Sequence, residues 1–271
     1  MTSSSPAKQS EEFVPFSARL VAAMRAKESK RPDRLFNDPF AGELAGEEAL
    51  TFLEQNFKAR VQVYVTLRTH FLDNFILSTS TDVNQIVILG AGMDARAYRL
   101  PWSSAIKIYE LDRLPVLETK KTILQEVVPR CQHYHIAADL TQSWSHLLLA
   151  QGYQPQLPSA WLLEGLLVYL NESEVHQLLK IISELATTGS YLGLDIANVT
   201  AVEKADEPYK SYFRFGCDRP EELLAEYGWE AEAIATGDKR VHFDLERFSD
   251  RFPSPDIPDV GRGFFVRAKK K

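Results

Sequence analysis

The sequence is poor in cysteine: its 271 residues include only Cys131 and Cys217. The two residues are far apart and match no metal-ligand spacing, so we expect no metal site. Two cysteines are also too few to suggest a disulfide framework in a chain of this size. A reducing, cytoplasmic environment is the prediction that follows.

Long apolar runs and an excess of basic charge are absent too. No run approaches the roughly 18–20 apolar residues of a membrane span, and residues 1–8 lack the apolar core of a signal peptide. The formal net charge is -6, and basic residues are scattered apart from a tail at 269–271. We therefore expect neither a membrane nor nucleic acid as a partner. The oligomeric state is left open.

The remaining composition is that of an ordinary globular protein, with 45% hydrophobic and 25% charged residues. Residues 16–24 and 61–77 repeat apolar positions at intervals of three and four, which predicts helices. Between them, residues 31–40 contain two prolines that break helix and strand. We expect residues 1–80 to form a helical lid.

From residue 84 the pattern changes to short apolar runs separated by helix-like stretches. The runs predicted as strands are 85–89, 106–111, 134–137, 160–163, 190–195, 230–235 and 263–268. Alternation of strands and helices predicts a doubly wound, mostly parallel sheet of the Rossmann-like α/β class, closed by an antiparallel last strand. Residues 84–271 would form this core, and 1–271 a single domain.

The first predicted strand ends in the turn Gly90-Ala91-Gly92. A lone Gly-x-Gly turn is weak evidence, because a tight turn without any ligand has the same pattern. Asp94 lies where the next helix starts, and a carboxylate there would repel a phosphate. The turn therefore suits a nucleoside without phosphates better than a dinucleotide.

The next three strands also end in acids. Asp112 lies 22 residues beyond Gly90, near the ~20-residue spacing at which an acid binds ribose hydroxyls in nucleotide folds. Asp139 could accept from an adenine amino group, with Leu140 on the ring, and Glu164 ends the fourth strand. Helix capping is the simpler interpretation of each acid alone. Together they favour a cationic ligand, and S-adenosylmethionine supplies a sulfonium and an ammonium.

Five segments of the chain resemble the leucine carboxyl methyltransferase-like O-methyltransferases, a group of class I S-adenosylmethionine enzymes. The segments are 31–41 (RPDRLFNDPFA), 87–100 (VILGAGMDARAYRL), 109–121 (YELDRLPVLETKK), 161–170 (WLLEGLLVYL) and 220–230 (PEELLAEYGWE). The resemblance implies that the turn at 90–92 passes under the cofactor. It also implies that Asp112 holds the ribose, Asp139 and Leu140 the adenine, and Glu164 the methionine amino group.

The same resemblance gives two arginines a role. Arg68 matches an arginine that binds the methionine carboxylate in this family, and Arg25 is the nearest match to a basic residue that shares the task. Without the resemblance, Arg68 would be interpreted as a surface charge on an amphipathic helix. A guanidinium can bind a carboxylate through two parallel hydrogen bonds, which explains an arginine here.

The sequence gives fewer signals for residues that contact the methyl acceptor. The six histidines sit in no motif with a partnering carboxylate, so we expect them to be structural or exposed. Tyr169 is our candidate for contacting the acceptor, and residues 209–215 form either an acceptor wall or a packed loop. Methyl transfer to a hydroxyl or carboxyl oxygen of a small molecule, such as a polyketide or peptide intermediate, is the function favoured. Protein C-terminal carboxyl methylation and a non-catalytic nucleoside-binding module remain alternatives.

Overall fold

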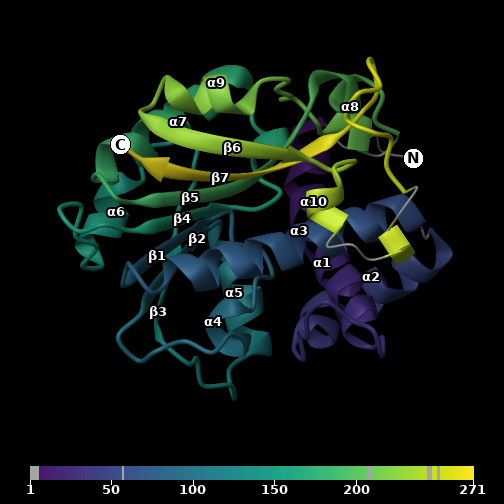
Figure 1. Ribbon diagram of the computed structural model, residues 1–271. Helices are drawn as coiled ribbons and strands as arrows, with labels where there is room; N and C mark the ends of the chain where they lie inside the picture. Colours follow the sequence, from purple (N-terminus) through teal and green to yellow (C-terminus); the bar gives the residue numbers. More distant parts are fainter. Residues whose placement is uncertain (1–5, 57, 207–208, 243–245, 249–250) are drawn as a thin grey trace.

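The chain is built around one seven-stranded sheet in the order β3-β2-β1-β4-β5-β7-β6 (Figure 1). The computed structural model describes residues 6–56, 58–206, 209–242, 246–248 and 251–271. Strands β1 to β5 run parallel, whereas β7 is antiparallel to both of its neighbours, β5 and β6. The predicted doubly wound sheet with an antiparallel last strand is confirmed. The strands are β1 (Gln85–Leu89), β2 (Lys107–Asp112), β3 (Gln132–Ala137), β4 (Ala160–Leu163), β5 (Tyr191–Ala197), β6 (Trp229–Ala235) and β7 (Gly263–Lys270).

The central strands are apolar because both faces of the sheet are covered. All residues of β1 and β4 are buried, as expected for parallel strands between two helical layers. The helices in the described part of the chain are α1 (Pro6–Ser29), α2 (Ala41–Gln55), α3 (Ala59–Thr79), α4 (Arg96–Arg99), α5 (Leu114–Ile123), α6 (Ser145–Ala150), α7 (Glu172–Leu185), α8 (Val199–Glu203), α9 (Pro220–Ala225) and α10 (Lys239–His242). Three single turns of 3-10 helix are η1 (Leu167–Tyr169), η2 (Tyr209–Ser211) and η3 (Glu246–Phe248).

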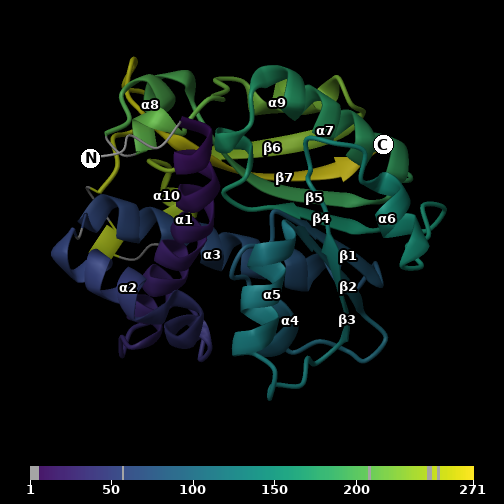
Figure 2. The ribbon, with the colours of Figure 1, turned by 180° about the vertical axis from the view of Figure 1, so that it is seen from behind.

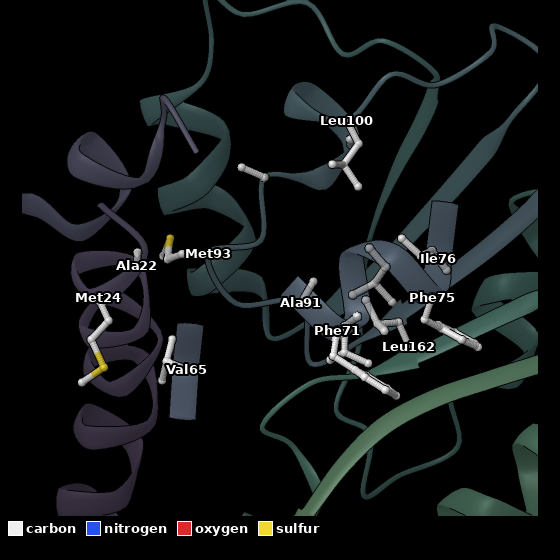
Figure 3. Close-up of a cluster of buried hydrophobic side chains, with 14 of the residues drawn as sticks. Ala22, Met24, Val65, Phe71, Phe75, Ile76, Ala91, Met93, Leu100 and Leu162 are labelled. Carbon is white, nitrogen blue, oxygen red and sulfur yellow. The ribbon is translucent and has the colours of Figure 1, made fainter. Parts of the chain in front are cut away.

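Helix α3 covers one face of the sheet. Its Phe71, Phe75 and Ile76 belong to the same buried cluster as Leu162 of β4, as Figure 3 shows. A Cβ atom at Gly193 of β5 would lie 2.4 Å from the Phe75 ring, so only glycine permits this close approach. The segment predicted at 61–77 therefore contributes directly to the core of the domain.

Helix α7 covers the opposite face. Its apolar residues at 175, 178, 179, 182 and 185 are buried against a second cluster that contains Trp161 of β4. The helix begins at a capping box. The Asn171 side chain accepts from the Glu174 backbone N–H, and the Glu174 side chain accepts from the Asn171 backbone N–H. The sheet is thus held between two hydrophobic clusters.

Residues N-terminal to α3 form α1 and α2, which pack on each other. The sequence interpretation did not single out α2, which is kinked at Gly46, where φ is +71°. Helix α1 stands beyond the carboxyl ends of the parallel strands in both views (Figures 1 and 2). A lid role for 1–80 stays a prediction, and residues 1–5 lie outside the described part of the chain.

Among the helices that the structure describes, none is both long enough and apolar enough to cross a membrane.

Candidate functional site

A cavity of about 940 Å³ opens at the carboxyl ends of the parallel strands. This is the edge at which ligands bind in doubly wound sheets. Every site residue predicted from the sequence lines it, from α1, α3 and the strand ends: Arg25, Arg68, Gly90, Ala91, Gly92, Asp112, Asp139, Leu140, Glu164 and Tyr169. The structure thus brings together residues that are up to 144 positions apart in the chain (25 to 169). Their ligand roles remain predictions.

The glycine turn after β1 needs glycine at both positions. Gly90 and Gly92 have φ angles of +65° and +49°, in the left-handed region that side chains disfavour. A Cβ atom on Gly90 would lie 2.9 Å from Leu166, and one on Gly92 would lie 3.1 Å from Ala18 of α1. The bare backbone of the turn therefore forms part of the cavity wall.

Asp112, the last residue of β2, is bound to this turn. Its carboxylate accepts from the Gly92 N–H at 2.6 Å and from the Arg113 N–H at 2.7 Å. Burial raises the pKa of Asp112, and these two N–H groups oppose the rise. A carboxylate has about four lone-pair positions, so Asp112 can accept further hydrogen bonds from a ligand.

Asp139 and Leu140 follow β3 and form the next part of the wall. The Asp139 Oδ1 atom accepts from the Thr141 N–H at 2.9 Å and from the Thr141 hydroxyl at 2.7 Å. These bonds hold an exposed carboxylate in one orientation. Leu140 is 9% exposed and offers an apolar surface beside it.

Glu164, directly after β4, lies between two buried arginines. Arg68 Nε donates to its Oε1 at 3.1 Å, and Arg96 Nη1 lies 2.7 Å from its Oε2. Burial alone would raise the pKa of Glu164, but Arg96, Arg68 and Arg25 outweigh it and lower that pKa to about 2. Glu164 is therefore a carboxylate over the physiological pH range.

Asp195 near the end of β5 completes the group, although the sequence interpretation missed it. Its Oδ2 accepts from Arg68 Nη1 at 3.1 Å and from the Tyr64 hydroxyl at 2.7 Å, while its Oδ1 accepts from the Gly165 N–H at 2.5 Å. The signal was present, because Asp195 ends the fifth predicted strand just as Glu164 follows the fourth. Arg68 is thus held by two carboxylates.

The role expected for Asp94 needs a correction. Asp94 is ion-paired with the guanidinium of Arg96 and also accepts from the Arg96 N–H at 2.6 Å. Arg96 in turn lies 2.7 Å from Asp73, which also binds Arg99. The charge of Asp94 is therefore compensated within the protein, and the inference that a free carboxylate repels phosphate at this helix start is not supported.

Arg25 enters the cavity from α1. Its Nε donates to Asp38 at 2.9 Å, and its Nη2 donates to the carbonyl of Met93, just beyond the glycine turn. Asp38 belongs to the proline-containing segment between α1 and α2, so this pair connects that segment to α1. Arg25 thereby links α1 to the turn after β1.

Aromatic side chains form another part of the cavity wall. Tyr169 lies in η1, and its ring meets Phe213 edge-on at 5.7 Å between centroids. Tyr209, Tyr212 and Arg214 line the cavity as well. The predicted segment 209–215 therefore contributes to the wall of the same cavity, although binding of an acceptor there remains a prediction.

Two of the six histidines have a carboxylate neighbour in space, although no sequence motif marks it. His133 and His135 on β3 lie 3.3 and 3.4 Å from the carboxylate of Glu110 on β2. A sequence motif does not reveal this contact, because Glu110 lies on the neighbouring strand, 23 residues before His133 and 25 residues before His135.

Residues 18–183 match the sequence profile of the leucine carboxyl methyltransferase family. A protein of Parafrankia sp., named provisionally as an S-adenosyl-L-methionine-dependent methyltransferase, is 37% identical over 93% of this chain and 86% of its own length. The chain belongs to the leucine carboxyl methyltransferase family. A relative from Streptomyces coelicolor with the same provisional name is 34% identical over 82% of this chain and 85% of its own length.

Solved structures support the fold of this leucine carboxyl methyltransferase family member. A protein of the DUF574 family from Streptomyces avermitilis has a TM-score of 0.64 and 16% identity, covering 94% of this chain and 97% of that one. A Thermobifida fusca protein, named provisionally as a methyltransferase, has a TM-score of 0.58 and 16% identity, and covers 94% of both chains. At this identity the likeness concerns the fold alone.

The ion pairs of Glu164 make the stability of this family member sensitive to acid. The folded-state pKa of about 2 lies below the ordinary 4.5, so the contribution is complete above the ordinary value and is lost as the pH falls toward the folded value. Between about pH 5 and about pH 3 the loss should be about 2 kcal/mol. Urea unfolding of the wild type and of Glu164→Gln at both pH values measures it. An equal pH dependence in the two proteins would contradict the assignment.

Proposed function

We propose that this S-adenosylmethionine-dependent methyltransferase transfers the methyl group to a hydroxyl or carboxyl oxygen of a small molecule. The observation that carries the proposal is the composition of the cavity wall. A glycine turn, Asp112 and the pair Arg68–Glu164 share one cavity at the carboxyl ends of parallel strands. The names of the relatives support the same cofactor.

The adenosine half would lie along β1 to β3. Asp112 would accept from the ribose hydroxyls with the lone pairs that the Gly92 and Arg113 N–H groups leave free. The bare backbone at Gly90 lets the ligand approach the sheet closely. Asp139 would accept from the adenine amino group, and Leu140 would pack on the ring.

The methionine half would lie between β4 and α3. A free amino acid end carries an ammonium and a carboxylate, which complement a neighbouring carboxylate and guanidinium. Glu164 would bind the ammonium, while Arg68, with Arg25, would bind the carboxylate through charge-assisted hydrogen bonds. Asp195 and Tyr64 hold Arg68 in place for this contact.

The bound cofactor supplies an activated methyl group, and the protein's residues position the acceptor and exclude water. Tyr169 would contact the acceptor together with the aromatic wall of Tyr209, Tyr212 and Phe213. Burial raises the pKa of Tyr169, although a hydrogen bond with Ser17 opposes the rise. The Tyr169 hydroxyl therefore stays protonated at neutral pH and orients the acceptor as a hydrogen-bond donor. A carboxylate acceptor needs no base.

We propose a small acceptor, such as a polyketide or peptide intermediate, because the site is a concave pocket of about 940 Å³, within the size range of small-molecule sites. The cavity is partly covered by α1, which contributes Ser17, Ala18 and Arg25 to its wall. We propose that α1 acts as a lid that limits access to the reacting atoms. An acceptor would then enter past the aromatic wall.

The test is incubation of the purified chain with methyl-labelled S-adenosylmethionine and, separately, with the small-molecule and protein fractions of a cell extract. We expect label in an oxygen-methylated small molecule, identified by mass spectrometry, and no label with an Asp112→Ala variant. If the label is found only at a protein C-terminus, the acceptor is a protein and the small-molecule proposal is wrong. Cofactor binding without transfer to either fraction would favour a non-catalytic nucleoside-binding module.

A further inference from the structure

A second group of buried polar side chains lies between β2 and β3. Glu110 of β2 pairs in register with His135 of β3, and His133 is two residues earlier on the same face of that strand. The His133 and His135 Nε2 atoms lie 3.3 and 3.4 Å from the Glu110 carboxylate. None of the three residues lines the cavity described above, so the proposed transfer reaction leaves the group without a role.

Burial makes this group unusual. The Glu110 side chain is fully buried, the His133 side chain is 3% exposed, and that of His135 is 22% exposed. Neither Nε2 atom makes a hydrogen bond of normal geometry within the described residues. Two imidazole nitrogens and a carboxylate that meet in one buried place, close together but without hydrogen bonds of normal geometry, are arranged as the ligands of a metal ion are.

We propose that Glu110, His133 and His135 bind a divalent transition metal ion, with Zn²⁺ as the best candidate. Their three ligand atoms lie within 4.8 Å of one another. Imidazole nitrogens and a carboxylate oxygen are ligands that Zn²⁺ accepts, at about 2.0–2.2 Å each. Small side-chain rotations would bring the atoms to that distance from a shared ion, and His135, whose side chain is 22% exposed, is the most exposed of the three residues.

Lys120 of α5 is the main competitor for the carboxylate. Its ammonium lies 2.5 Å from Glu110 Oε2 and also donates to the Asp94 carbonyl at 3.1 Å. The other oxygen, Oε1, faces His133 and remains available to a metal. A carboxylate that ligates a metal is commonly hydrogen-bonded through its second oxygen, and Lys120 provides that partner.

The position of the site gives it a structural role. Glu110 is two residues before Asp112 on β2, and the ion would bind β2 to the neighbouring strand β3. Lys120 extends the connection to the backbone of Asp94, next to the glycine turn. The metal would therefore stabilise the strand ends that carry Asp112 and Asp139, without taking part in methyl transfer.

The experiment uses the full chain, stripped of metal with a chelator and then titrated with Zn²⁺ or Co²⁺. We expect one equivalent to bind, a higher unfolding temperature, and visible absorption bands from the Co²⁺ form. His135→Ala should lose all three effects. His146→Ala is the matched control, because His146 is exposed on α6 and outside the group; it should keep them.

Two results would overturn the proposal: a wild type that binds no Zn²⁺ or Co²⁺, or a His135→Ala variant that binds as well as the wild type. Absence of binding would assign the group to a metal-free cluster in which both histidines pair directly with Glu110. If His133→Ala does not fold, His135→Ala and Glu110→Gln still decide the matter, since His135 is the more exposed ligand. Glu110→Gln should also lose the Co²⁺ bands.

Discussion

Replacing Arg68 with alanine is expected to lower the free energy of unfolding by about 3–5 kcal/mol, the cost of removing one partner from a buried ion pair. Arg68 is 6% exposed and donates to Glu164 and Asp195, both at 3.1 Å. Among the described residues, its loss leaves the buried Asp195 with Tyr64 and Gly165 as its hydrogen-bonding partners. Urea unfolding at neutral pH measures the change.

The matched control for this effect is Arg219→Ala. Arg219 pairs with Glu222 at 2.9 Å, but both side chains are more than 60% exposed, at 75% and 67%. Exposed pairs contribute about 0–1 kcal/mol, so this variant should unfold almost as the wild type does. If Arg68→Ala were no more destabilised than Arg219→Ala, the buried network would not have the energetic role assigned to it.

Replacing Asp112 with alanine is expected to weaken cofactor binding by about 100-fold or more. Two hydrogen bonds from ribose hydroxyls to a charged acceptor contribute about 1.5–3 kcal/mol each, and each 1.4 kcal/mol is about tenfold in affinity. The variant also removes the acceptor of the Gly92 N–H, which loosens the turn. Calorimetric titration with S-adenosylhomocysteine measures the affinity.

Asp82→Ala is the matched control, because it removes an aspartate that lies outside the cavity. Asp82 accepts from the Tyr191 hydroxyl at 2.6 Å and does not line the cavity, so its removal should leave the affinity unchanged. The free energy of unfolding of Asp112→Ala should be measured in parallel. This measurement separates the loss of hydrogen bonds to the ribose from a disturbance of the glycine turn. Affinity within threefold of the wild type, in a folded Asp112→Ala variant, would argue against the ribose assignment.

Much of the sheet was predictable because its signals are local. Strands β1 and β4 are apolar runs that are buried throughout, and the glycines of the turn at 90–92 are required by positive φ angles within a few residues. Parallel strands place their carboxyl ends at one edge, so acids such as Asp112 and Glu164 could be assigned to a common site before the fold was known. The cavity lining agrees with that assignment.

Other features depend on which side chains meet in space. Arg96 binds Asp73 of α3 and Glu164 beyond β4, and no spacing in the sequence relates these residues. The partnership of Glu110 with His135 depends on the register of β2 against β3. Helix α2 lies within the region predicted as helical but was not identified separately, and the structure adds a kink at Gly46. Long-range pairing of charges, unlike apolar periodicity, leaves no local trace.

The most direct test of the central claim is a crystal structure of the chain with S-adenosylhomocysteine. The account predicts the nucleoside in the cavity, its ribose hydroxyls within hydrogen-bonding distance of Asp112, and its amino acid end at Glu164 and Arg68. A ligand bound in the cavity with its ribose away from Asp112, or bound elsewhere on the protein, would contradict it.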